Sequence, residues 1–303
     1  MEFEGRAPFA VDGLPPSCET WYKVFGDLKD ISKVPLFVLH GGPQAGHEYL
    51  LSLRDLHEPI IFYDQVGCGK STTGLPEQTG DGSWWTSQLH CKELSNLIAH
   101  LGLEHRPIDV IGHSWGGMLA SEWASDRVRA KNLRRLVLYS SLASIEGHVK
   151  GLEETRALLP QDVQSTIERG LKDQDFESPE LKDAMDVFLT GYVSLSQPFP
   201  CDEVKPAFVN LATSKLHKIV WGPHFLVPSG LIRSWTSIPF LHQIQVPTLM
   251  TRGSVEYIPD SAMQPFFDLI PKIKWITFEN AAHFSHIEQR EKFLTEVRHF
   301  LAD

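Results

Sequence analysis

The sequence contains few cysteines and no long apolar run, and both features narrow what the protein can be. The cysteines, Cys18, Cys68, Cys91 and Cys201, are scattered and form no Cys-x-x-Cys pair. This spacing is typical of free thiols rather than of a disulfide framework or a zinc site. No apolar stretch approaches the roughly 20 residues of a membrane-spanning helix, and the first residues show no secretory signal. We therefore expect a cytoplasmic protein.

Positive charge is also scarce. The chain has 28 Lys and Arg residues against 38 Asp and Glu residues, which gives a formal net charge of −10 and a pI near 5.8. Nucleic acids and anionic membranes are bound by clustered Lys and Arg side chains, and no such cluster occurs. We expect a small-molecule substrate as the partner, with neither nucleic acid nor membrane bound, while the sequence leaves the oligomeric state open.

The segment from Ile108 to Gly117 combines an apolar run with a Gly-x-Ser-x-Gly motif and a helical continuation. A strand, a sharp turn and a helix have this pattern, with Ser114 at the apex of the turn. Such a turn requires glycine at the flanking positions, here Gly112 and Gly116, because neighbouring backbone comes too close to leave room for a Cβ. The motif alone is weak evidence for a catalytic serine. Whether it marks one depends on finding a base and an acid elsewhere in the chain.

Strand-like and helix-like segments alternate through the first part of the chain. An edge strand or a hairpin is predicted at 19–28, strands at 35–39, 59–63, 108–113 and 133–139, and helices at 84–101 and 118–125. Alternation of this kind predicts an α/β fold with a mostly parallel sheet and helices on both faces.

The alternation stops after residue 142, where helical patterns follow one another. Helices are predicted at 145–159, 161–172, 179–195 and 205–217, before strands return at 246–252 and 274–278 with helices at 262–270 and 288–301. We interpret residues 143–237 as a helical cap inserted into a sheet domain that is formed by residues 1–142 and 238–303. The return of the strands favours an insertion over an independent second domain.

A serine hydroxyl needs a base that is itself held by a carboxylate. In sheet hydrolases these partners follow in the order Ser, Asp or Glu, His. His283 is the favoured base because small residues precede it after a strand, and His286 is the rival. Glu256 is the favoured acid because it comes soon after the strand 246–252, whereas Asp260 suits the N-cap of the next helix.

The oxyanion of an acyl-transfer reaction is bound by backbone N–H groups. One donor is expected from Trp115, which follows the nucleophile. The other is expected from Gly42 in the His-Gly-Gly-Pro segment 40–43, which follows an early strand.

We expect no cofactor and no metal. The segment 69–71 reads Gly-Lys-Ser, but a phosphate-binding loop would also need glycine where Asp64 stands. His283 and His286 lie close in sequence, but no third metal ligand clusters with them.

Several segments together resemble the proline iminopeptidase-like branch of the α/β-hydrolases. They are 40–43 (HGGP), 63–71 (YDQVGCGKS), 112–117 (GHSWGG), 221–223 (WGP), 251–253 (TRG), 263–268 (MQPFFD) and 275–286. The resemblance covers nearly the whole chain from Trp21 onward. It implies an α/β-hydrolase fold with a cap, no cofactor, and a serine mechanism that uses Ser114 and His283.

Two departures from the family's pattern concern the acid and the substrate. Relatives commonly carry an aspartate as the triad acid where this chain has Glu256. Relatives that cleave N-terminal residues carry a cap glutamate in a Gly-Pro-Asn-Glu-Phe segment, and this chain reads Gly-Pro-His-Phe-Leu at 222–226. A buried ammonium without a carboxylate partner is costly, and nothing in the sequence places Glu153 or Glu154 near Ser114.

The resulting hypothesis is a cofactor-independent serine hydrolase that cleaves an amide, ester or thioester of an apolar small molecule or modified amino acid, in fungal-type secondary-metabolite biosynthesis. Its candidate substrate-binding residues are Trp221, His224, Phe225 and Trp235. The alternatives are an aminopeptidase of the proline iminopeptidase type and a non-hydrolytic cyclase, isomerase or small-molecule receptor on the same fold.

Overall fold

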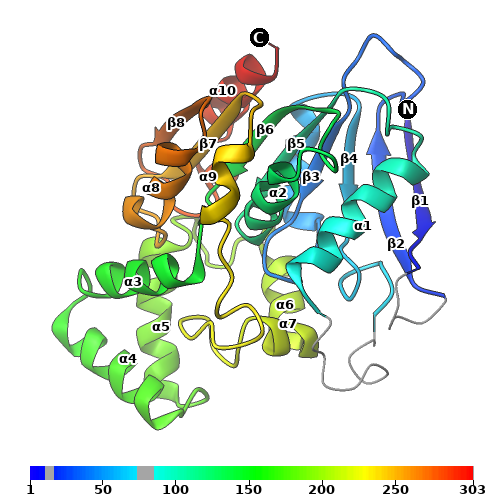
Figure 1. Cartoon of the computed structure of the whole chain (residues 1–303). Helices are drawn as coiled ribbons and strands as arrows, with labels where there is room; N and C mark the ends of the chain where they lie inside the picture. Colours follow the sequence, from blue (N-terminus) through cyan, green and yellow to red (C-terminus); the bar gives the residue numbers. More distant parts are fainter. Residues whose placement is uncertain (11–16, 74–84, 303) are drawn as a thin grey trace.

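An eight-stranded sheet forms the centre of the structure, a computed structural model that describes residues 1–10, 17–73 and 85–302 (Figure 1). The strands are β1 (Glu2–Pro8), β2 (Glu19–Phe25), β3 (Leu36–Leu39), β4 (Ile60–Tyr63), β5 (Ile108–His113), β6 (Leu133–Tyr139), β7 (Thr248–Gly253) and β8 (Ile273–Phe278). Their order is β1-β2-β4-β3-β5-β6-β7-β8. The first two strands are antiparallel to their neighbours and the other six are parallel. The predicted α/β fold with a mostly parallel sheet is confirmed.

Strands in the middle of the sheet are buried along their whole length. Every residue of β3, β4 and β5 is buried, which is why these strands read as near-continuous apolar runs rather than as alternating patterns. Both faces of the parallel part are covered, and the main hydrophobic core lies against it.

The helices outside the long insertion form two groups. They are η1 (Glu48–Asp55), α1 (Ser87–His100), α2 (Trp115–Ser125), η3 (Ile238–Gln243), α8 (Asp260–Leu269), α9 (Ser285–Glu288) and α10 (Arg290–Ala302). In one group α1 packs on α2, α2 on η3 and η3 on α8, and in the other η1 packs on α9 and α9 on α10.

Five α-helices lie between β6 and η3 in the sequence, and we call them the inserted helices. They are α3 (Ile145–Arg156), α4 (Gln161–Asp173), α5 (Pro179–Tyr192), α6 (Lys205–Thr213) and α7 (Lys215–Val220). Figure 1 shows them gathered at one edge of the sheet, away from the two termini. That edge carries the carboxyl ends of the parallel strands, where ligands bind in open α/β folds.

Three elements differ from the sequence prediction, each for a local reason. The edge strand β1 was not predicted, because its residues are mostly exposed and it has no apolar alternation. The single helix expected at 205–217 is two helices, because Ser214 adopts an extended conformation and its hydroxyl caps α7. The closing helix begins at Arg290, since Gln289 is non-helical. Trp84, the expected start of α1, lies outside the described residues.

The turn between β5 and α2 has the sharp geometry expected from its sequence. Ser114 has φ 55° and ψ −120°, a conformation that a non-glycine residue rarely adopts. A Cβ on Gly112 would lie 2.2 Å from the Gly116 carbonyl oxygen, and one on Gly116 would lie 2.2 Å from the Leu39 carbonyl oxygen. Helix α2 therefore lies so close to the sheet backbone that only glycine fits at these two positions.

Two expectations from composition can be compared with the structure. All four cysteines are unpaired, as predicted. Within the described ranges, no helix has both the length and the apolar character needed to cross a bilayer.

We predict that Gly116→Ala destabilises the fold by about 1–3 kcal/mol, the usual cost of overpacking a filled core. The added methyl group would overlap backbone that cannot move without separating α2 from β3. Urea unfolding followed by circular dichroism measures the change.

Gly191→Ala in α5 is the matched control, because a Cβ there would meet nothing within 4 Å. Alanine in a helix is favoured over glycine by up to about 1 kcal/mol, so this variant is expected to be neutral or slightly stabilised. Equal unfolding midpoints for the two variants would contradict the close-approach argument.

Three fully buried histidines make stability depend on pH. Burial lowers the pKa of His40 to about 4, of His148 to about 3 and of His286 to about 4. In the unfolded chain their pKa values return to about 6.5, so the unfolded state binds more protons as the pH falls below that value. We predict that the free energy of unfolding falls on acidification, these three alone contributing about 4 kcal/mol per pH unit near pH 5.

His148→Phe is the variant that isolates one of these contributions. Neither ring nitrogen of His148 has a hydrogen-bond partner in the described parts of the chain, so an apolar ring of similar shape loses no hydrogen bond. We expect the slope of unfolding free energy against pH to decrease by about 1.4 kcal/mol per pH unit. An unchanged slope would show that His148 is not buried as a neutral group.

Candidate active site

A small pocket opens at the turn that carries Ser114. It has a volume of about 80 Å³ and we call it the Ser114 pocket. Its walls include Gly41, Gly42, Ser114 and Trp115 from the sheet side, Tyr257, His283 and Phe284 from the loops after β7 and β8, and Val193, Phe208, Leu211, His217, Trp221 and Phe225 from the insertion. The carboxyl edge of the sheet and the inserted helices thus enclose the space in front of the serine.

Glu256 is buried in the loop after β7 and both of its carboxylate oxygens are engaged. Oε2 accepts hydrogen bonds from the Ser140 hydroxyl at 2.8 Å and from the Gly253 N–H at 3.3 Å. Oε1 lies 2.5 Å from Nδ1 of His283. Because a carboxylate only accepts, Nδ1 of His283 is the donor and Nε2 is the nitrogen left to act as an acceptor.

His283 is buried and is held through its backbone as well as its ring. Its N–H donates to the Val193 carbonyl at the end of α5, 3.1 Å away. Its carbonyl oxygen accepts from Nε2 of His113 at 3.0 Å and lies 3.0 Å from the Tyr139 hydroxyl. The loop after β8 therefore presents the imidazole to the Ser114 pocket in a fixed orientation.

His286, the rival base, lies elsewhere. It is fully buried, its Nε2 lies 3.0 Å from the Tyr49 carbonyl oxygen and its Nδ1 lies 2.8 Å from the Tyr139 hydroxyl. Burial lowers the pKa of His286 to about 4. It does not line the Ser114 pocket, so the structure places it as a link between η1, β6 and the His283 loop.

Tyr49 connects the glycine loop after β3 with the histidine loop. Its hydroxyl accepts from the Gly41 N–H at 2.7 Å and lies 2.7 Å from Nδ1 of His113. Nε2 of His113 donates to the His283 carbonyl, so its Nδ1 must accept and Tyr49 must donate. Burial lowers the pKa of His113 well below its ordinary value, which keeps this ring neutral.

The Ser114 hydroxyl has Tyr257 as its neighbour. Burial and the nearby Glu256 carboxylate raise the pKa of Tyr257, and the neighbouring Ser114 hydroxyl opposes this only weakly, so the phenol stays protonated. The Tyr257 ring also packs against His283, with centroids 4.8 Å apart. No hydrogen bond between Ser114 and His283 is found in the described residues, and such bonds often tighten only when substrate binds.

The two expected oxyanion donors both face the Ser114 pocket. Gly42 and Trp115 line it, and the N–H groups of both lack an acceptor among the described residues. Gly42 has φ +119°, and a Cβ there would lie 2.5 Å from the Gln44 backbone nitrogen. Only glycine can therefore adopt the backbone conformation that this loop has at position 42.

The candidate substrate-binding residues separate into three places. Trp221 and Phe225 line the Ser114 pocket. His224 lines a neighbouring hollow and stacks on Phe176 with ring centroids 5.2 Å apart. Trp235 lies outside the pocket wall, where its indole N–H donates to Glu122 at 2.8 Å.

Carboxylates are missing from the pocket wall as far as the structure describes it. Glu153 is exposed on α3, and Glu154 lies 3.0 Å from the Ser261 hydroxyl. Asp260 was expected to cap α8, but Pro259 is the N-cap, and Asp260 begins the helix and pairs with Arg252. Arg252 orders the Glu256 loop, which gives Asp260 a supporting position outside the pocket.

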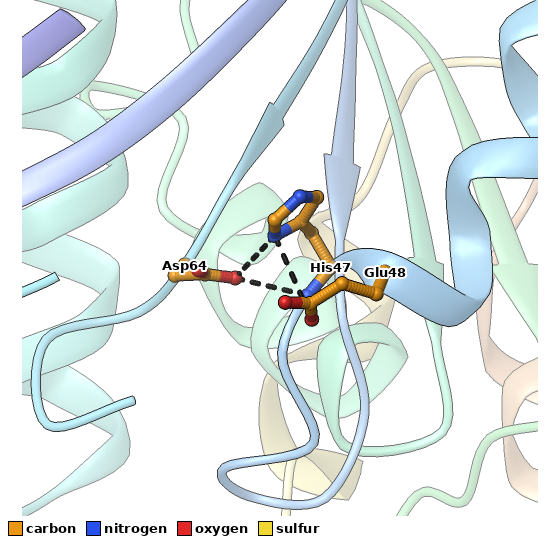
Figure 2. A group of neighbouring side chains, drawn as sticks. All are labelled: His47, Glu48 and Asp64. Atoms are coloured by element: carbon orange, nitrogen blue, oxygen red, sulfur yellow. Dashed lines mark hydrogen bonds and ion pairs between the residues drawn. The ribbon is translucent and has the colours of Figure 1, made fainter. Parts of the chain in front are cut away.

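One cluster of potential metal ligands occurs in the described parts of the chain, formed by His47, Glu48 and Asp64 (Figure 2). Asp64 Oδ1 already accepts from the His47 N–H at 2.9 Å and lies 2.8 Å from His47 Nδ1. Asp64 Oδ2 accepts from the Lys70 N–H at 2.8 Å. These bonds join the loops after β3 and β4, and a metal would have to replace the His47–Asp64 bond.

Sequence reasoning missed several residues that shape this site. Tyr49, His113, Ser140 and Tyr257 contact the nucleophile, base or acid loops, but each is a single polar or aromatic residue without a motif. The sequence Gly-His-Ser points to His113 only through its position before the nucleophile.

Comparison with known proteins relates this geometry to a family. Residues 34–289 match the family described as the alpha/beta hydrolase fold. The chain is 30% identical over 291 residues to a proline iminopeptidase of Lactiplantibacillus plantarum, covering 94% of this chain and 97% of that protein. It is 31% identical over 283 residues to a proline iminopeptidase of Saccharolobus solfataricus, covering 92% and 87%.

Solved structures agree with this relation. A proline iminopeptidase of Mycobacterium smegmatis superposes with a TM-score of 0.89 at 28% identity, and VinJ with a TM-score of 0.89 at 33% identity. Each comparison covers 99% of this chain and 98% of the other. The expected fold and hydrolase relationship are confirmed, and the chain belongs to the alpha/beta hydrolase family, with proline iminopeptidases among its relatives.

Proposed function

We propose that the protein is a serine hydrolase that cleaves an ester, thioester or amide of an uncharged, largely apolar acyl group. The observation that carries the proposal is the combination of the Glu256–His283 bond with a serine in a strained turn, both at one apolar pocket. An intermediate of secondary-metabolite biosynthesis would meet this description of the substrate.

In the proposed reaction, Ser114 Oγ attacks the substrate carbonyl while Nε2 of His283 takes its proton. Glu256 holds the imidazole in the required tautomer and stabilises its positive charge. The N–H groups of Gly42 and Trp115 bind the oxyanion. His283 then protonates the leaving group, and a water molecule activated by His283 hydrolyses the acyl-enzyme.

The charge of the substrate is inferred from the wall of the pocket. A substrate with a free α-amine would place an ammonium against aromatic and aliphatic side chains, without a described carboxylate to pair with. Removal of a charge from water without a partner costs several kcal/mol. An acyl group that is neutral at this end avoids the cost.

Aminopeptidase activity is the second candidate, favoured by the names of the relatives at 30% identity. It would require an ammonium-binding group outside the described wall of the Ser114 pocket. The two candidates differ in one measurable property, the response to a block on the substrate amine.

We predict that Glu256→Gln lowers kcat for p-nitrophenyl butyrate by about 10²- to 10⁴-fold, because the amide no longer favours the required histidine tautomer. Glutamine keeps the shape of the side chain and its hydrogen bond with Ser140. Labelling of Ser114 by a fluorophosphonate, located by peptide mass spectrometry, should slow in parallel.

Asp260→Asn is the matched control, because Asp260 pairs with Arg252 outside the pocket. Its kcat is expected to change by less than about threefold, in line with a surface-exposed charge that touches no substrate. A larger loss in Asp260→Asn than in Glu256→Gln would assign the acid role to Asp260.

We also predict that leucine p-nitroanilide with an acetylated amine is cleaved with a higher kcat/KM than the free-amine compound, by about tenfold or more. The reason is the cost of placing an ammonium in an apolar wall. Assays at two pH values, below and above the substrate amine's pKa, show whether the free base is accepted better than the cation. A strong preference for the cation would favour the aminopeptidase candidate.

A further inference from the structure

A second hollow adjoins the Ser114 pocket. Its volume is about 340 Å³, and it lies between α5 on one side and α6 and α7 on the other. Phe208, Leu211, His217 and Phe225 line both spaces. These four residues border both spaces, so the larger hollow is the neighbouring space that a molecule too long for the 80 Å³ in front of Ser114 would enter.

His217 presents an acceptor at this junction. Its Nδ1 lies 2.8 Å from the Pro43 carbonyl oxygen, and a carbonyl only accepts, so Nδ1 carries the proton. Burial lowers the pKa of His217, which keeps the ring neutral near pH 7. Nε2 therefore offers a lone pair, and none of the described residues donates a hydrogen bond to it.

The wall of the second hollow favours an uncharged chain. Phe176, Leu181, Met185 and Leu189 contribute apolar surface. The charged residues that line it, Lys182, Asp186 and Lys218, are exposed to solvent, and Lys182 is paired with Glu177 at 2.8 Å.

We propose that the substrate is an N-acylated aminoacyl compound whose amide N–H donates to Nε2 of His217 and whose N-acyl chain occupies the second hollow. The inference rests on the proposed function, since it extends the acyl group that Ser114 would receive. Acylation of the amine satisfies both parts of the site: it removes the ammonium that the Ser114 pocket cannot pair, and it supplies the chain that the second hollow can hold.

The hydrogen bond is tested with two p-nitrophenyl esters, one of N-octanoyl-leucine and one of its isostere in which the N–H is replaced by oxygen. The wild type is expected to prefer the N–H compound by about tenfold or more in kcat/KM, because the oxygen faces the His217 lone pair. The measured quantity is the ratio of the two kcat/KM values in each variant.

Two substitutions at His217 separate its two ring nitrogens. His217→Asn keeps an N–H near the Nδ1 position, where it can still donate to Pro43, but has no atom at the Nε2 position. His217→Gln places an amide oxygen near the Nε2 position. The ratio of kcat/KM for the N–H compound to kcat/KM for the oxygen isostere should fall to about one in His217→Asn. It should remain well above one in His217→Gln.

The chain site is tested with Leu189→Trp, which fills the second hollow, against Val187→Trp on the exposed face of the same helix. The first variant should lower kcat/KM for the N-octanoyl ester about tenfold relative to the N-acetyl ester. The second should leave this relative value at the wild-type level.

A ratio near one in the wild type, or the same ratio in wild type and His217→Asn, would overturn the role of His217. Equal chain-length preference in Leu189→Trp and Val187→Trp would overturn the role of the hollow. Failure of the proposed function is a separate result, in which Ser114→Ala hydrolyses these esters as fast as the wild type. In that case calorimetric binding of N-octanoyl-leucinol still decides the inference, which requires at least about tenfold weaker binding by His217→Asn than by His217→Gln.

Discussion

The close approach of α2 to the sheet is the constraint on which the site depends. Gly112 and Gly116 bring the start of the helix so near to the end of β3 that no side chain fits between them. This contact forces Ser114 into its strained conformation and places it beside the glycine loop that follows β3. The backbone N–H of Trp115 and the loop carrying Gly42 come to the same pocket for the same reason. Packing in the interior of the sheet therefore decides the geometry at its edge.

Much of this architecture could be predicted from the sequence, because apolar runs and glycine motifs are local signals. The parallel strands were predicted from buried runs such as β3 and β5, and the turn at Ser114 from its flanking glycines. The exposed edge strand β1 and the break at Ser214 lack such signals, since the first depends on pairing with β2 and the second on a single side-chain cap.

The surroundings of the candidate site were less accessible to sequence reasoning. Pocket walls are built from residues far apart in the chain, and a lone tyrosine or histidine such as Tyr257 or His217 has no pattern around it. The resemblance to the family predicted that the segment 222–226 lacks a carboxylate, and the described pocket wall carries no acidic group. The lack of a carboxylate could thus be predicted from the sequence. The hydrogen-bond acceptor Nε2 of His217 could be recognised only from the bond between Nδ1 of His217 and the Pro43 carbonyl oxygen.

Tyr49 has a consequence for the coordination of the two halves of the site. One phenol contacts the loop that holds the proposed oxyanion donor and, through His113, the loop that holds the proposed base. Every link in this relay is a bond between neutral groups, since the imidazole in the middle is kept uncharged by burial. The spacing of the two loops is therefore insensitive to buffer acidity in the neutral range. The proton transfer that we propose for His283 would proceed without loosening the frame that aligns it.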